Sequence, residues 1–506
     1  MKKKWIYGSM LGLSICLSHE IYAMDEVVQS KIDNKSVPIT RDGHSFADAH
    51  HQSDEDALIE DLTLVAKARG WTFAEAMADH KVAEEIGAIA VKLSKSRPDI
   101  FIGSVLSMEP GGTPSLYVKG VAGKEVHDLV ASAKRHIKVV DRQPFSLKEL
   151  NQRKKQVTKM LRDQGVDNFS VSVDFRNKGK VDVIVAKKSG TAPQISDIKS
   201  TLPISLRADV NLTVSDKPAM VPYSAFGGMY INISCTSGWS VFNRYATTGV
   251  TSSSHCNTPV GILHEGEGWH SMTLQQKYYG SFGDVAWSTT VSDEPPLFFA
   301  SENQIRNVNS VEPHAGISIN EPICFYGRGS NRRDCNTRVV STINACNSNW
   351  ASDDNLVRMS GNSMIFGDSG GGASYNTRVF GSVSGWCNGG TVFTVADLYD
   401  EAIGVKVRTT SHRKLKIRKT GPGSGSVTSS PRGISCGYDC GEFYNYGTVV
   451  RLYANTSSSI TPFFGGDADC NDGVVTMNRD VNCTVHFEDS GSDPIDPPIY
   501  PPINPL

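Results

Sequence analysis

The chain has 506 residues, and its 51 basic and 53 acidic side chains give a formal net charge of −2. At roughly 150 residues per domain this length predicts two to four folding units, and the balanced charge gives no electrostatic footprint for a nucleic acid partner. An apolar content of 39% excludes a collagen-like or wholly disordered chain.

The start of the chain has the pattern of a secretory signal peptide, which we assign to residues 1–23. Basic residues at Lys2–Lys4 precede the mostly apolar stretch Trp5–Leu17, and Ile21–Ala23 offers a cleavage site. The apolar stretch is too short for a lasting anchor, and no later stretch is long enough to span a membrane. Lipid attachment at Cys16 is a disfavoured alternative, because a large residue precedes it. We expect a secreted protein, extracellular or periplasmic.

The cysteines agree with export. Of the 11 cysteines, ten follow Cys16, and the first of these ten is Cys235. An even number of cysteines in an oxidising compartment predicts disulfides. Residues 24–224 carry none of them, so the chain combines two regions of different construction.

Residues 24–224 are predicted to form an α+β region. Helices are indicated by apolar residues at helical spacing and by two capping boxes. The boxes pair Thr72 with Glu75 and Ser146 with Glu149. Strands are indicated at Phe101–Met108 and Leu116–Lys119, and a hairpin around 177–179, where apolar residues alternate on both sides of a turn.

From about Ala225 the pattern becomes all-β, with Gly, Ser, Thr and short apolar runs. One helix is expected near Val395–Ile403. Residues 409–425 are basic and then glycine-rich, which favours a solvated linker over a membrane-surface patch. A small cysteine-containing β module is expected at 426–487, followed by a disordered tail, 488–506, rich in Pro and Asp.

The strongest chemical signal is the run Gly367–Gly371 around Ser369. A serine hydroxyl attacks a carbonyl only when a base takes its proton and donors hold the developing oxyanion. A glycine before the serine lets the backbone turn its N–H groups toward one point. Gly367 and Ser369 are therefore candidate oxyanion donors. The alternative is an ordinary glycine-rich turn.

A candidate base stands at His255, next to Cys256. Histidine is the usual base near neutral pH. Cys235 lies 21 positions before Cys256 and is its natural disulfide partner, which would hold the backbone at the histidine.

A candidate carboxylate partner for the base is Asp284, flanked by apolar residues that would bury it. Such a carboxylate sets the tautomer and the orientation of the imidazole. Asp293 and Glu294 are rivals, but the prolines beside them favour an exposed loop.

With these residues in the order His, Asp, Ser, residues 225–408 resemble the chymotrypsin-like serine proteases, most closely the bacterial branch of α-lytic protease and the streptogrisins. The matching segments are Phe226–Gly228, His255–Cys256, Gly283–Ala286, Gly367–Gly371 and Ser382–Gly385. The resemblance implies two six-stranded antiparallel β-barrels with the catalytic triad between them. It also implies a disulfide between Cys324 and Cys335. Cys346 is paired with Cys387 by elimination, because the cysteine that the family has before the nucleophile loop is absent.

The resemblance also implies how substrate binds. Ser382–Gly385 would be the strand that pairs with the substrate backbone, so Ser384, Gly385 and Trp386 are candidate substrate-binding residues. Trp386 stands where the family usually has a glycine lining the specificity pocket, which indicates a narrowed pocket and a small or apolar residue before the cut.

Many members of this branch carry a long N-terminal pro-region. Residues 55–185 look like one, so we assign residues 24–224 as a pro-region. It would assist folding, inhibit the cleft and be removed by cleavage near Met220–Ala225. A slow-folding, non-local β topology gives such a template a physical purpose. The alternative is a permanent substrate-binding or anchoring domain.

The C-terminal module is similar to a small bacterial β repeat attached to secreted proteins. Its four cysteines predict the pairs Cys436–Cys440 and Cys470–Cys483, since a module of this size has little core. A zinc site is the rival, disfavoured because no C-x2-C pair is present.

The sequence thus predicts a multidomain, secreted serine endopeptidase made as a zymogen, which acts on polypeptides through an acyl-enzyme intermediate. We expect a monomer, with no cofactor and no metal. One alternative is a non-catalytic binding or adhesion protein on a protease scaffold. The other is an esterase or lipase, whose Gly-x-Ser-x-Gly elbow is absent.

Overall fold

A computed structural model describes most of the chain between residues 50 and 489. The described residues are 50–164, 166, 169–186, 202, 204–215, 220–222, 226–227, 229–231, 235–256, 261–264, 268–290, 294–347, 352–361, 364–457 and 459–489. The expected signal peptide, and the expected tail after residue 489, lie outside them. The chain divides into two compact units, Met1–Ser240 with Gly249–Val407 and Val241–Thr248 with Arg408–Leu506.

The N-terminal part of the first unit is α+β, as its sequence pattern predicts. The elements are β1 (His50–His51), α2 (Asp54–Arg69), α3 (Phe73–Ser96), β2 (Phe101–Val105), β3 (Ser115–Lys119), α4 (Lys124–Ala131), β4 (Lys138–Gln143), α5 (Leu147–Asp163), β5 (Phe169–Asp174), β6 (Lys180–Ala186), α7 (Ile204–Arg207) and β7 (Val210–Ser215). Both capping boxes are formed, at the N-termini of α3 and α5. Within the described residues, no helix has the length and apolar character that a membrane crossing needs.

The rest of the first unit has most of its described residues in strands, with one short α-helix. Its elements are β8 (Met220–Pro222), β9 (Phe226–Gly227), β10 (Tyr230–Ile231), β11 (Cys235–Thr236), β12 (Ser240–Asn243, which ends in the second unit), β13 (Thr248–Ser252), β14 (Gly261–His264), β15 (Gly268–Ser271), β16 (Thr273–Gly280), β17 (Gly283–Thr289), β18 (Leu297–Ser301), β19 (Gln304–Asn307), β20 (Ser310–Val311), β21 (Cys324–Gly327), β22 (Arg332–Asp334), β23 (Val339–Asn347), β24 (Ser352–Met359), β25 (Gly372–Tyr375), β26 (Arg378–Cys387), β27 (Gly390–Val395), α8 (Tyr399–Ile403) and β28 (Val405–Val407). The helix expected near Val395–Ile403 is thus present as α8.

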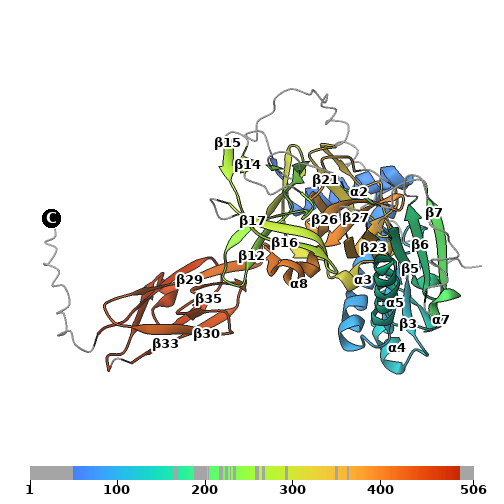
Figure 1. Ribbon diagram of the computed structural model, residues 1–506. Helices are drawn as coiled ribbons and strands as arrows, with labels where there is room; N and C mark the ends of the chain where they lie inside the picture. The colour runs from blue at the N-terminus through green and yellow to red at the C-terminus, as the bar shows by residue number, and fades with distance from the viewer. Residues whose placement is uncertain are drawn as a thin grey trace, which may run out of the picture. The chain divides into compact units, whose positions relative to one another are not determined.

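One large sheet joins the two halves of the first unit. Its strands follow the order β22-β21-β25-β26-β27-β24-β23-β5-β6-β7, so the N-terminal hairpin β5–β6 continues the sheet beyond β23 (Figure 1). Helix α5 packs on β5 and β23. One of the hydrophobic clusters extends through both halves, from Leu62 and Phe169 to Phe325 and Phe393. Pairing with β5 covers an edge of β23 that would otherwise expose unpaired backbone groups.

Two smaller sheets build the region around the candidate site. In one, β17 pairs antiparallel with β13 and β16. In the other, the order is β15-β14-β10-β11-β9. The candidate base, His255, lies in the turn that follows β13, and the candidate carboxylate, Asp284, lies in β17 itself.

The second unit is a small β module with its own core. Its later strands are β29 (His412–Thr420), β30 (Gly425–Ser430), β31 (Ser435–Cys436), β32 (Gly441–Asn445), β33 (Val449–Thr456), β34 (Phe463–Gly466), β35 (Val474–Thr476) and β36 (Val481–His486). They form two four-stranded sheets, ordered β32-β29-β36-β34 and β31-β30-β33-β35. Disulfides join Cys436 with Cys440 and Cys470 with Cys483, as expected.

The expectation of a linker at 409–425 is wrong. Residues 412–420 form β29, an inner strand that pairs with β32 on one side and β36 on the other. Leu415 and Ile417 are buried in the module's core, while Lys416 and Arg418, each the next residue along the strand, face solvent. This is the alternation of a half-buried strand, which the density of basic residues obscures in the sequence.

Candidate active site

The structure brings the three chemically distinctive side chains into one hydrogen-bonded line. The Nδ1 atom of His255 lies 2.5 Å from Oδ2 of Asp284, and its Nε2 atom lies 3.0 Å from Oγ of Ser369. The side chains of His255 and Asp284 are 6% and 0% exposed. Distances of this size are hydrogen bonds, so the imidazole bridges a buried carboxylate and a hydroxyl.

Asp284 is the second residue of β17, where the strand pairs between β13 and β16. The backbone N–H of His255 donates to its Oδ1 atom at 3.0 Å. The backbone N–H of Asp284 donates to the hydroxyl of Thr394 at 2.8 Å, and that hydroxyl lies 2.8 Å from Oγ of Ser384. His255 thus holds the carboxylate of Asp284, and Thr394 holds its backbone.

Thr394 supports the site, although nothing in the sequence singles it out. It lies in β27, 110 residues from Asp284, and a threonine within a strand has no local signature. Ser384, expected to bind substrate, directs its hydroxyl to Thr394 and is buried. Any contact of Ser384 with a substrate would therefore use its backbone.

The histidine turn is attached to β11 and to the large sheet. The disulfide Cys235–Cys256 joins the residue after His255 to β11. The hydroxyl of Ser253 donates to the backbone carbonyl of Val383 at 2.8 Å. Two segments of the chain thus hold the backbone on either side of the imidazole.

The loop around Ser369 has a backbone that requires glycine. Gly367 and Gly370 have φ values of 118° and 88°, which only glycine adopts without strain. A Cβ atom on Gly370 would lie 2.3 Å from the backbone oxygen of Thr236. Thr236 also binds the loop directly, since its N–H donates to the carbonyl of Ser369 at 2.8 Å and its hydroxyl to that of Gly367 at 3.1 Å.

Asp368 anchors the same loop, a role that the sequence does not reveal. Its buried carboxylate accepts hydrogen bonds from the backbone N–H of Ile365 at 2.8 Å and of Ser330 at 2.9 Å, and from the Ser330 hydroxyl at 3.3 Å. Burial raises the pKa of Asp368, and these donors act against that rise. The side chain before the serine therefore ties the loop to the β21–β22 turn.

Part of the chain itself lies along the strand expected to bind substrate. Strand β8 pairs antiparallel with the end of β26, with Pro222 opposite Gly385 and Val221 opposite Trp386. Trp386 is half-buried, and on the other side its backbone pairs with β27. The expected cleavage segment therefore meets the backbone of two candidate substrate-binding residues.

The other described cysteines of the first unit form the disulfides Cys324–Cys335 and Cys346–Cys387. Among the described residues, two groups have metal-ligand spacing, one containing His255 and the other Asp61. Each group consists otherwise of two cysteines that are joined in a disulfide. Their sulfur atoms are not thiolates, the form in which cysteine binds zinc.

Comparison with known proteins gives neighbours among solved structures alone. No family model matches the chain, and no curated protein matches it. Nocardiopsis protease covers 37% of this chain with 99% of its own length, at 17% identity and a TM-score of 0.31. Cellulomonas bogoriensis chymotrypsin covers 38% with 99% of its length, at 15% identity and a TM-score of 0.29. The α-lytic protease homolog N4 covers 37% with 99% of its length, at 14% identity and a TM-score of 0.29. These neighbours are chymotrypsin-like and α-lytic-type proteases, and their likeness is limited to about a third of this largely β chain.

Proposed function

We propose that this protein is an exported serine endopeptidase made as a zymogen. The observation that supports this most is the hydrogen-bonded line from Asp284 through His255 to Ser369. A buried carboxylate, an imidazole and a serine hydroxyl in that order are the parts that acyl transfer needs.

In the proposed reaction, Ser369 Oγ attacks the scissile carbonyl while Nε2 of His255 takes its proton. Asp284 holds the Nδ1–H of the ring and stabilises the imidazolium that forms. The backbone N–H groups of Gly367 and Ser369 hold the oxyanion. The imidazolium then passes its proton to the leaving amine. In the second half of the reaction water attacks the acyl-enzyme, His255 takes the proton of the water, and the proton then returns to Oγ of Ser369 as the acid product leaves.

The substrate of this reaction is a polypeptide that adds to β26 as an extended strand. Gly385 and Trp386 would supply backbone pairing. Antiparallel pairing of β8 with the same residues supports this assignment, because a peptide segment of this chain already uses that edge.

The N-terminal region, residues 24–224, then acts as a pro-region. Two observations support an inhibitory role. Strand β8 lies along β26 where a substrate would pair. The hairpin β5–β6 continues, through β23, the sheet of residues 225–408, the proposed catalytic region. Cleavage near residues 220–225 would remove β8 from this edge. The five disulfides fit folding in an oxidising compartment.

The test is peptide hydrolysis by the protein after limited proteolysis of the segment near residue 222. We expect turnover of a mixed peptide library by the unaltered protein and a loss of about 10⁴- to 10⁶-fold in kcat for Ser369→Ala. Ser426→Ala, at an exposed serine of the second unit, is the matched control and should keep full activity. Equal turnover by Ser369→Ala and the unaltered protein would remove the proposed mechanism.

A further inference from the structure

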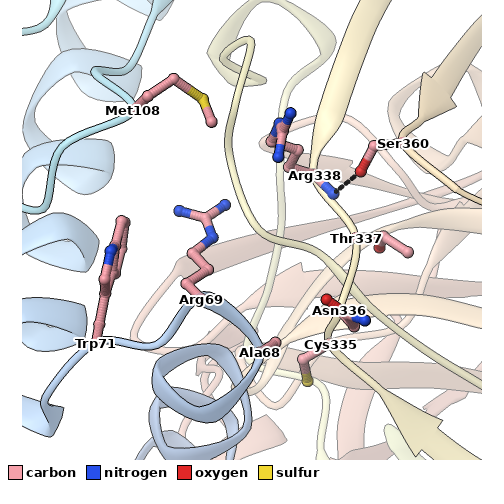
Figure 2. Close-up of a pocket in the computed structure, with 9 residues that line it drawn as sticks. All are labelled: Ala68, Arg69, Trp71, Met108, Cys335, Asn336, Thr337, Arg338 and Ser360. Carbon is pink, nitrogen blue, oxygen red and sulfur yellow. Dashed lines mark hydrogen bonds between the residues drawn. The ribbon is translucent and has the colours of Figure 1, made fainter.

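A cavity of about 210 Å³ lies within the first unit, away from the triad. One wall comes from the end of α2 and the loops that follow it. The other wall comes from the segment between β22 and β23 and from the end of β24. Its lining residues are Ala68, Arg69, Trp71, Met108, Cys335, Asn336, Thr337, Arg338 and Ser360 (Figure 2). The N-terminal and catalytic regions thus build the cavity together.

Two guanidinium groups, of Arg69 and Arg338, line this cavity (Figure 2). Burial lowers the pKa of Arg69, and the positive charge of Arg338 lowers it further. Two like charges close enough to act on each other in a partly enclosed space are unfavourable without a counter-charge.

The charges around the cavity do not balance within the described residues. Arg69 has one carboxylate, Asp79, at 3.4 Å, and it also donates to the carbonyl of Asn320 at 2.9 Å. Burial raises the pKa of Asp79 to about 6, which still leaves this carboxylate mostly ionised at neutral pH, so it offsets one of the two positive charges. For Arg338, the Nε atom is buried and has no hydrogen-bond partner in the described part of the chain.

Neutral groups beside the guanidiniums add to the lining. The Ser360 hydroxyl accepts a hydrogen bond from the backbone N–H of Arg338 at 3.1 Å (Figure 2), which leaves its own proton to donate. The Asn336 side chain is a further lining amide. Paired guanidiniums with neighbouring hydroxyl and amide donors are the recognition chemistry of oxygen anions.

We propose that this cavity binds a small tetrahedral oxyanion, phosphate or sulfate. Because its two walls come from different regions of the chain, the bound anion stabilises their contact. A ligand that binds the assembled form alone adds RT ln(1 + [L]/Kd) to its stability. Anion binding does not depend on the proposed protease activity. Its consequence, slower release of the N-terminal region in phosphate, does rest on that proposed function.

The experiment uses the full chain carrying Ser369→Ala, so that it stays uncleaved. Phosphate, sulfate and acetate are each titrated calorimetrically against sodium chloride at equal ionic strength, and the unfolding midpoint is recorded. We expect saturable binding of phosphate or sulfate and a higher midpoint in their presence. Arg338→Gln should weaken binding at least tenfold, while near-ultraviolet circular dichroism shows an unchanged fold.

Arg332→Gln is the matched control, because Arg332 is an exposed arginine six positions away that pairs with Asp334. It should bind as the parent does. Absence of saturable binding, equal binding by Arg338→Gln, or binding of acetate alone would each overturn the proposal. Since the parent already lacks the serine hydroxyl, these results stand apart from any result on proteolysis.

Discussion

The regions before and after the proposed catalytic region, residues 225–408, differ in how they are stabilised. The N-terminal region shares a sheet and a hydrophobic core with the catalytic region. The C-terminal module has two sheets, its own core and two disulfides of its own. A shared core makes the stability of one region depend on the other, whereas a module with its own core is expected to unfold separately.

A buried ion cluster connects the N-terminal region to residues 225–408. Asp61 of α2 is fully buried and binds Arg333 through two contacts, of 2.6 and 2.7 Å, and Arg306 at 3.0 Å. The backbone N–H of Asn376 also donates to it, at 2.6 Å. Burial raises the pKa of Asp61, but the two arginines offset this effect, so that the pKa lies below its usual value.

The largest loss of stability in one region alone is expected from Asp61→Ala, which acts on the first unit. This substitution leaves the guanidinium of Arg333 buried without its carboxylate, while Arg306 keeps Glu60, at 3.0 Å. Breaking such a buried ion pair costs about 3–5 kcal/mol. Calorimetry on the Ser369→Ala background should show the first unit's transition lowered and the C-terminal module's transition unchanged. Glu55→Ala, an exposed acid of the same helix, is the control, with an expected effect of about 0.3–1 kcal/mol. Equal shifts of both transitions would contradict the comparison.

A smaller effect, confined to the other region, is expected from Leu415→Ala. This side chain is 0% exposed in the core of the C-terminal module, and its truncation costs about 2–4 kcal/mol. The module's transition should fall, while the first unit's transition and peptide hydrolysis stay as they are. Lys416→Ala, exposed on the same strand, should change the module by less than about 0.5 kcal/mol. An unfolded catalytic region in Leu415→Ala would show that the module is not independent.

The smallest effect, and one that depends on pH, is expected from Glu321→Gln. Its buried carboxyl group accepts a hydrogen bond from the backbone N–H of Ser318 at 2.8 Å. Burial raises its pKa well above the usual value, and the negative charge of Glu312 adds to the rise. A raised pKa in the folded state means that this group favours folding at low pH and less so as pH rises through that pKa.

Glutamine keeps the acceptor for Ser318 but does not ionise. Glu321→Gln should therefore raise the unfolding midpoint of the first unit at pH 8, and the gain should shrink as the pH falls toward 5. Thermal unfolding at several pH values measures this. Glu401→Gln, exposed on α8, should give no such trend, and a gain for Glu321→Gln that grows on acidification would show that the sign is wrong.

Local patterns in the sequence predict much of what the structure contains. The capping boxes of α3 and α5 need only residues three positions apart. The glycines around Ser369 and the cysteine beside His255 are likewise local, and they single out side chains that the fold then brings within hydrogen-bond distance. These features could be read because their physical causes lie within a few residues.

Features that depend on distant partners could not be read in this way. Asp61 looks like any helical acid, and its partner Arg333 lies 272 residues away. Thr394 supports the site only because the fold brings β27 within hydrogen-bond distance of the backbone N–H of Asp284. The pairing of β5 with β23 depends on an uncovered strand edge, which no residue pattern marks. The sequence predicts a linker where β29 lies, because the many basic residues of this segment outweigh the alternation set by the buried Leu415 and Ile417.

The most direct test of the central claim is covalent labelling with a fluorophosphonate, after proteolytic removal of the N-terminal region, with the modified residue located by mass spectrometry. An imidazole that activates the hydroxyl predicts a single label on Ser369. Asp284→Asn should slow labelling by about 10⁴-fold, and His255→Ala should abolish it. A label on another serine, or an unlabelled Ser369 after the N-terminal region has been removed, would contradict the proposed mechanism. It would indicate a binding protein on this scaffold.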